Sequence, residues 1–126
     1  MVWPAPWRFM PVPARVARRA MAAHPVLVAG EGRACTALMR AATSGTVVKT
    51  GAEGVFTAIL PQQGLGVAVK IADGATRGAE CAITALLVRL GVIDAAHPTV
   101  RLYMDAPVLN RRNLLTGRIR AAATLR

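Results

Sequence analysis

The sequence predicts an α+β fold, in which an antiparallel meander of strands is flanked by helices. Two observations support this class. Three runs with the composition of strands, at residues 46–50, 54–60 and 65–72, follow one another with only short connections. Residues 76–90 then place apolar side chains at the spacing of an amphipathic helix. Short connections join antiparallel neighbours, and helices cover the sheet that those neighbours form.

The chain before the strands is expected to be helical after an irregular start. Residues 1–12 are rich in proline and predict an irregular lead-in, so that the domain covers residues 13–126. Pro13 suits the first turn of a helix, and Pro25 is expected to stop that helix. Its predicted apolar stripe is Val16, Ala17, Ala20 and Met21. A loop and a shorter helix over residues 34–42 follow.

Glycines mark the turns and the helix end in the second part of the chain. The connections GAEG and PQQG supply glycine for positive φ, as tight turns require. Gly91 is expected to end the helix over residues 76–90. A last strand is expected near residues 117–121. The predicted buried stripe of the long helix is Ala79, Ile83, Leu86, Leu87 and Leu90.

Length and composition predict one small domain with a thin core. The chain has 126 residues, of which 54% are hydrophobic, but 25 of these are alanine. Alanine buries little apolar area, so the core is weaker than the hydrophobic fraction suggests. We therefore expect either a weakly stable independent domain or one part of a larger unit.

The net charge of +10 raises the question of nucleic-acid binding. Basic surfaces bind phosphate backbones, but here the arginines are spread along the whole chain. No interleaving of basic and aromatic residues suggests base stacking. We expect no nucleic-acid partner and interpret the charge as a solvated arginine-rich surface. A basic binding module without chemistry remains an alternative function.

Membrane and secretory segments are not predicted. No uncharged apolar run reaches the roughly 18 residues that a membrane span requires. Prolines interrupt the first residues where a secretory signal needs an apolar stretch. Cys35 and Cys81 form neither a disulfide framework nor a CxxC unit. A cytoplasmic location follows by default.

The use of lysine points to a candidate for chemistry. Of sixteen basic residues, fourteen are arginine, and only Lys49 and Lys70 are lysine. Arginine keeps its charge, whereas its surroundings can convert lysine to a neutral amine. Lys49 lies inside a β-branched run just before a glycine-rich turn. The alternative interpretation is a solvated lysine on a strand.

The segment VVKTGAEGVFTAILPQQGLGVAVKIADGATRGAE resembles the C-terminal half of the bacterial L-asparaginase II family of the Rhizobium type. The flanking stretches AMAAHPVLVAGEGRACTALM and LLVRLGVIDAAHP extend the resemblance over about residues 13–122. KTGAEGV and KIADGATR are its specific parts. The resemblance implies hydrolysis of L-asparagine to L-aspartate and ammonia. It also implies the fold of serine β-lactamases and glutaminases, in which a Lys-Thr-Gly segment edges the active site.

The resemblance assigns roles to residues around this segment. Family members use a serine in a Ser-x-x-Lys motif, together with a second serine and a second lysine. The second lysine corresponds to Lys49, which would take the proton of a serine hydroxyl or keep a neighbouring lysine neutral. Thr50, Gly51 and Glu53 follow as substrate-binding positions.

A zinc ion is a further expectation from the resemblance. Cys35 resembles the family's metal-binding cysteine, which a second cysteine and a lysine complete near the substrate. Cys81 does not match that second cysteine, so the site is incomplete in this chain. Structural zinc takes about four ligands, and a buried thiol is the alternative interpretation of Cys35. We interpret His24 and His97, which both precede proline, as structural.

The chain departs from the family at the nucleophile. Its only serine is Ser44, and Val47 stands where Ser-x-x-Lys requires lysine. We expect that the N-terminal half of the family domain is absent, so that the chain is truncated and inactive alone. Thr50 is a poor replacement, since the side chain of Lys49 points to the other face of the strand. A complementing N-terminal half and a homodimer are the expected partners. A β-lactamase-like acyl-transfer relative is a further alternative, less favoured by GAEGV and DGATR.

Overall fold

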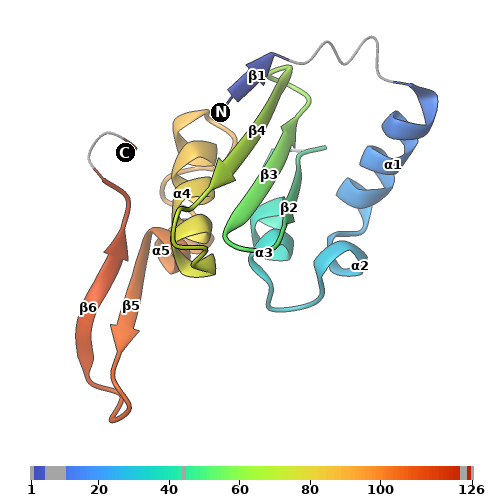
Figure 1. Ribbon diagram of the computed structural model, residues 1–126. Coiled ribbons are helices and arrows are strands. Elements are labelled where there is room, and N and C mark those ends of the chain that lie inside the picture. The colour runs from blue at the N-terminus through green and yellow to red at the C-terminus, as the bar shows by residue number, and fades with distance from the viewer. Residues whose placement is uncertain (1, 5–10, 44, 123–124, 126) are drawn as a thin grey trace.

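A computed structural model of the protein describes residues 2–4, 11–43, 45–122 and 125. Figure 1 shows helices packed against an antiparallel sheet, as the α+β class predicts. In chain order the elements are β1 (Val2–Pro4), α1 (Val12–Ala23), α2 (Pro25–Ala29), α3 (Ala34–Ala41), β2 (Val47–Thr50), β3 (Val55–Leu60), β4 (Leu65–Lys70), α4 (Thr76–Arg89), α5 (Pro98–Met104), β5 (Asp105–Leu109) and β6 (Leu115–Arg120).

The predicted meander of β2, β3 and β4 is present, and a fourth strand extends it. The strand order is β1-β4-β3-β2, and every pair is antiparallel. The expectation that residues 1–12 are irregular is wrong at Val2–Pro4, which pair with β4, and at Val12, where α1 begins. Pairing with β1 satisfies the edge of β4 that would otherwise be open. The remaining residues of the predicted lead-in, 5–10, lie outside the described part of the chain.

One face of the sheet carries the core. Val48, Ala58 and Val67 are neighbours in register across three strands, and all three are buried. The helices α3 and α4 cover this face (Figure 1), and they contribute the buried side chains of Leu38, Ile83 and Leu87. The stripe predicted for the long helix is thus largely correct, although Leu86 and Leu90 are only partly buried.

The stripe predicted for the first helix is wrong. Val16, Ala17 and Ala20 are exposed, and Met21 alone of the predicted set is partly buried. The face turned inward carries Ala14, Arg18, Met21 and Ala22, which also follow helical spacing. The guanidinium of Arg18 donates a 2.8 Å hydrogen bond to the carbonyl of Gly45, just before β2. This hydrogen bond and the packing of Met21 and Ala22 against the core hold α1 in this orientation.

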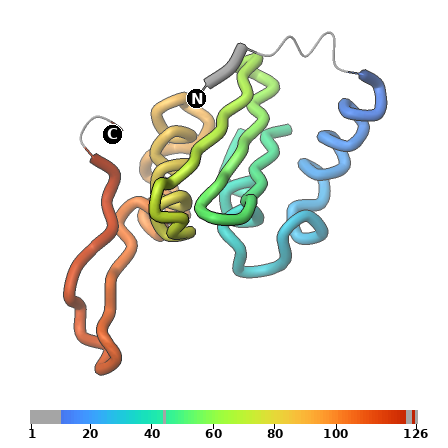
Figure 2. Tube along the Cα trace, in the orientation of Figure 1, coloured from blue at the N-terminus to red at the C-terminus, as the bar shows by residue number. Residues whose placement is uncertain are grey.

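The region after α4 differs most from the prediction. The expected last strand is present as β6, but it pairs with β5, and neither β5 nor α5 was predicted. Figure 2 shows the β5–β6 hairpin extending away from the rest of the described chain. The side chain of Asn110 accepts hydrogen bonds from the amides of Arg112 and Leu114 and so fixes the hairpin turn. Within the described residues, no helix has the length and apolar character needed to cross a membrane.

Candidate active site

The Lys-Thr-Gly segment lies at the end of an edge strand. β2 pairs with β3 on one side and has no strand on the other side among the described residues. The amide of Gly51 donates a 2.8 Å hydrogen bond to the carbonyl of Val55, so residue 51 faces β3. Antiparallel pairing alternates along a strand, and the backbone groups of Thr50 therefore face the open edge.

Both backbone groups of Thr50 are bonded to side chains at this edge. The Thr50 amide donates to the Sγ of Cys35 at 3.1 Å, and the Thr50 carbonyl accepts from the Nζ of Lys49 at 3.1 Å. Cys35 is buried in the first turn of α3, and its position follows from the packing of that helix beside β2. Three of the five predicted site residues, Cys35, Lys49 and Thr50, thus form one hydrogen-bonded group.

The side chain of Lys49 lies on the open face of the sheet. Lys49, Thr57 and Ala68 are register neighbours across β2, β3 and β4, and all three are exposed. Within the described residues, no carboxylate forms an ion pair with Lys49. The ammonium group is therefore accessible to another molecule that approaches this face.

The hydroxyl of Thr50 is bonded to main-chain carbonyls. Its Oγ1 lies 3.2 Å from the carbonyl of Gly51 and 3.3 Å from that of Val55, in donor geometry to both. The amine of Lys49 bonds the Thr50 carbonyl and not this hydroxyl. A nucleophile needs a base in hydrogen-bond contact, and this arrangement does not provide one.

Close packing favours glycine at position 51. A Cβ atom at this position would lie 3.2 Å from the Cβ and Cγ1 atoms of Val55. This separation is shorter than ordinary carbon–carbon contact, which begins at about 3.5 Å. The turn that follows places Glu53 at a positive φ of 54° with an exposed side chain. Its carboxylate therefore stands beside the end of β2, in reach of solvent.

Sequence reasoning assigned no role to Lys70, and the structure gives it one. The Lys70 ammonium donates to the carbonyl of Glu53 at 2.6 Å and to that of Ile71 at 2.9 Å. It thereby ties the turn after the Lys-Thr-Gly segment to the end of β4. A compact ammonium group has three donors in a tetrahedral arrangement, and a planar guanidinium does not reproduce that geometry. In a chain that otherwise uses arginine for its basic residues, the presence of lysine at positions 49 and 70 was the sequence feature that set both residues apart.

Sequence reasoning also missed two ionisable residues with shifted pKa values, Glu80 and Tyr103. Burial raises the pKa of Tyr103, and the nearby Glu80 carboxylate and Cys35 thiol raise it further. Burial raises the pKa of Glu80 as well, while the charge of Arg33 acts in the opposite direction. These groups come from α4, α5 and the residue before α3, so no sequence motif links them.

The described residues do not assemble a metal centre around Cys35. No group of three or more histidine, cysteine, aspartate or glutamate side chains among them is placed to hold a metal ion. Cys81 packs in a separate cluster with Ala85 and Ala121. Cys35 alone offers one sulfur ligand, and zinc stays a prediction for a site that other ligands complete.

A comparison with protein families places these residues in a known group. A model of the L-asparaginase II family matches residues 10–121, which include all five predicted site residues. A comparison with curated proteins found no match to the chain.

Proposed function

Because the chain belongs to the L-asparaginase II family, we propose that it carries the Lys-Thr-Gly side of a site that hydrolyses L-asparagine to L-aspartate and ammonia. The observation that best supports this proposal is the position of the Lys49 amine. The amine of Lys49 is exposed on the open face of an edge strand, and the next two residues of the motif are held in place by Cys35 and Val55. This geometry leaves the amine free to meet a substrate or a second catalytic group.

The proposed reaction is acyl transfer through a hydroxyl nucleophile. The hydroxyl oxygen attacks the side-chain amide carbon of asparagine, the carbon–nitrogen bond breaks, and ammonia leaves. Water then hydrolyses the resulting ester and releases L-aspartate. In its neutral form, Lys49 would take the proton of the attacking hydroxyl and, as an ammonium, return it to the leaving nitrogen.

The neighbouring residues fit the two ends of the substrate. Thr50 and Gly51 would contact the substrate where the end of β2 reaches the surface. Beyond them, the amide of Ala52 donates to no protein acceptor among the described residues. A turn amide without a protein acceptor is suited to an oxygen that becomes negative during attack. The exposed carboxylate of Glu53 has the charge to bind the α-ammonium group of asparagine.

The nucleophile itself is proposed to come from a second polypeptide segment. Neither Ser44 nor Thr50 has a sequence partner of the Ser-x-x-Lys kind, and Ser44 lies outside the described residues. The hydroxyl of Thr50 is already bonded to main-chain carbonyls. We therefore propose that this chain alone is inactive and that a segment carrying Ser-x-x-Lys completes the site.

A complementation assay tests this proposal. The purified chain should release ammonia from L-asparagine only at background rate. A fusion to the Ser-x-x-Lys segment of a related asparaginase should be active, and replacement of that serine by alanine should abolish the activity. Turnover by the unfused chain that Thr50→Ala abolishes would instead identify Thr50 as the nucleophile. A folded but inactive fusion would favour the non-catalytic binding module.

A further inference from the structure

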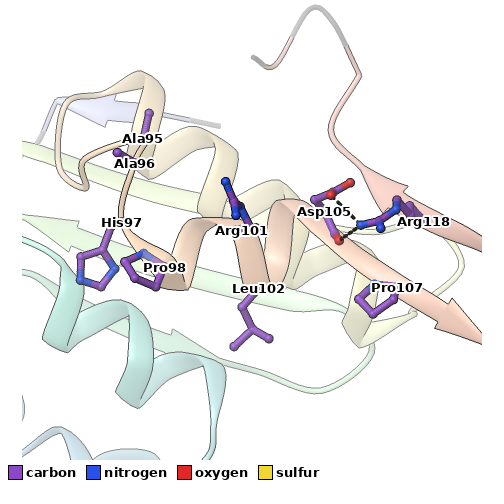
Figure 3. Close-up of a pocket in the computed structure, with 9 residues that line it drawn as sticks. All are labelled: Ala95, Ala96, His97, Pro98, Arg101, Leu102, Asp105, Pro107 and Arg118. Atoms are coloured by element: carbon purple, nitrogen blue, oxygen red, sulfur yellow. Dashed lines mark hydrogen bonds and ion pairs between the residues drawn. The ribbon is translucent and has the colours of Figure 1, made fainter.

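A second site lies apart from the Lys-Thr-Gly segment. A pocket of about 550 Å³ is formed by the loop before α5, by α5 itself and by the base of the β5–β6 hairpin. Pockets of roughly 300–1,000 Å³ are typical of small-molecule sites. Figure 3 shows Arg101, Asp105 and Arg118 around this pocket, together with Pro98, Leu102 and Pro107. Neither Lys49 nor Thr50 lines it, so it is distinct from the proposed amidohydrolase site.

The charged groups of the pocket leave Arg101 without a carboxylate partner among the described residues. Asp105 accepts from Arg120 at 2.6 Å and from Arg118 at 2.7 Å, so each of its oxygens already has a partner. The hydrogen bond from Arg120 contributes most to lowering the pKa of Asp105 below its ordinary value, and the charges of both arginines add to this effect. The carboxylate therefore stays ionised. Arg101 forms no ion pair with any described residue. Two arginines and one carboxylate line the pocket, and Arg120 beside it is bonded to the same carboxylate, so this side of the chain carries an excess of positive charge.

The remaining lining is apolar and partly exposed. Leu102 is 58% exposed, although it is a large hydrophobic residue on a helix. Pro98 and Pro107 are exposed on the same pocket wall. Exposed apolar side chains next to an unpaired guanidinium suit a ligand with a short hydrocarbon body and a negative end. Burying that body against Leu102 would contribute about 25 cal/mol for each Å² of apolar surface removed from water.

We propose that this pocket binds a small organic carboxylate, with the guanidinium of Arg101 on the carboxylate and Leu102 and Pro107 against the hydrocarbon body. A guanidinium presents two parallel N–H donors that match the two oxygens of a carboxylate. The same carboxylate chemistry occurs in a free acid and at the C-terminus of a peptide.

Titration with isovalerate, followed by NMR of the full chain, tests the proposal. Isovalerate should shift the Leu102 methyl and Arg101 Nε–H signals with a Kd of about millimolar order, which suits so small a ligand. Isovaleramide, which has the same shape without the charge, should bind at least about tenfold more weakly. Acetyl-alanyl-leucine distinguishes a free acid from the C-terminus of a peptide as the natural ligand. A lower Kd for this dipeptide than for isovalerate would indicate a peptide C-terminus.

A matched pair of variants separates a site from general attraction to a basic protein. Arg101→Gln should raise the Kd for isovalerate about tenfold or more. Arg77→Gln removes the same charge from an exposed position on α4 outside the pocket, and it should change the Kd less than about twofold. Equal effects of the two variants, or the absence of saturation by isovalerate, would overturn the proposal.

Discussion

The backbone amide of Thr50 donates a hydrogen bond to the Sγ of Cys35 over 3.1 Å, which joins α3 to the Lys-Thr-Gly segment. The sulfur is buried, with 1% of Cys35 exposed, while the segment that it holds reaches the surface. One buried atom therefore fixes the backbone of an exposed functional segment. This relationship gives Cys35 a positioning role that does not depend on a metal.

Cys35→Ala should destabilise the chain and loosen the segment. The change removes the acceptor of the Thr50 amide and leaves a small cavity, and because this hydrogen bond is only partly buried we expect a loss of about 1 kcal/mol. Urea unfolding measures the loss, and hydrogen exchange of the Thr50 amide locates it. Cys35→Ser keeps an acceptor and should preserve more of the protection of that amide. Unchanged exchange of the Thr50 amide in Cys35→Ala would contradict the role proposed for the sulfur.

The two lysines should differ in their contribution to stability. Lys70→Met removes two hydrogen bonds, to Glu53 and Ile71, whereas Lys49→Met removes one to the adjacent residue. Because both side chains are exposed, we expect about 1 kcal/mol for Lys70→Met and under about 0.5 kcal/mol for Lys49→Met. Equilibrium unfolding of the two variants makes the comparison. The reverse order would show that the bonds of Lys70 do not hold the turn.

Gly54→Ala should cost more than Gly91→Ala. Both glycines have a φ of 69°, so both substitutions place alanine in the left-handed region. A Cβ at Gly54 would lie 2.9 Å from the carbonyl carbon of Gly74, whereas a Cβ at Gly91 meets nothing within 4 Å. We expect the unfolding free energy of Gly54→Ala to be lower by about 1 kcal/mol or more than that of Gly91→Ala. Equal losses would mean that the turn shifts to accommodate the methyl group.

Lys49→Arg should abolish most activity of the fused enzyme without unfolding it. Arginine keeps the charge but cannot act as a base, and acid–base groups typically contribute about 10²- to 10⁴-fold to the rate. Ammonia release measures this loss, and circular dichroism checks the fold. Lys70→Arg disturbs the turn at Glu53 but replaces no group proposed to move a proton, so it should cost less than about tenfold in rate. Similar losses in both variants would make Lys49 an ordinary surface lysine.

The local sequence pattern was sufficient to predict the helices and strands that carry the candidate site. The β-branched runs with glycine turns predicted β2, β3 and β4, and helical spacing predicted α3 and α4, each to within two residues at its ends. These elements are determined by neighbours in the sequence, through turn geometry and apolar periodicity. By contrast, α5 and β5 are short, and Pro107 inside β5 argues against a strand. Pairing with β6 stabilises β5, and this pairing cannot be seen in the local sequence of β5.

The sequence by itself determined which residues form the Lys-Thr-Gly segment, that it lies on a strand before a tight turn, and that no Ser-x-x-Lys motif accompanies it. Only the tertiary structure decided that Cys35 bonds Thr50, that Lys70 holds the turn at Glu53, and that Asp105 pairs with Arg118 and Arg120. Each of these contacts joins residues at least 13 positions apart. Their geometry depends on how helices pack on the sheet and how strands register, which are properties of the folded chain and not of any local run of residues.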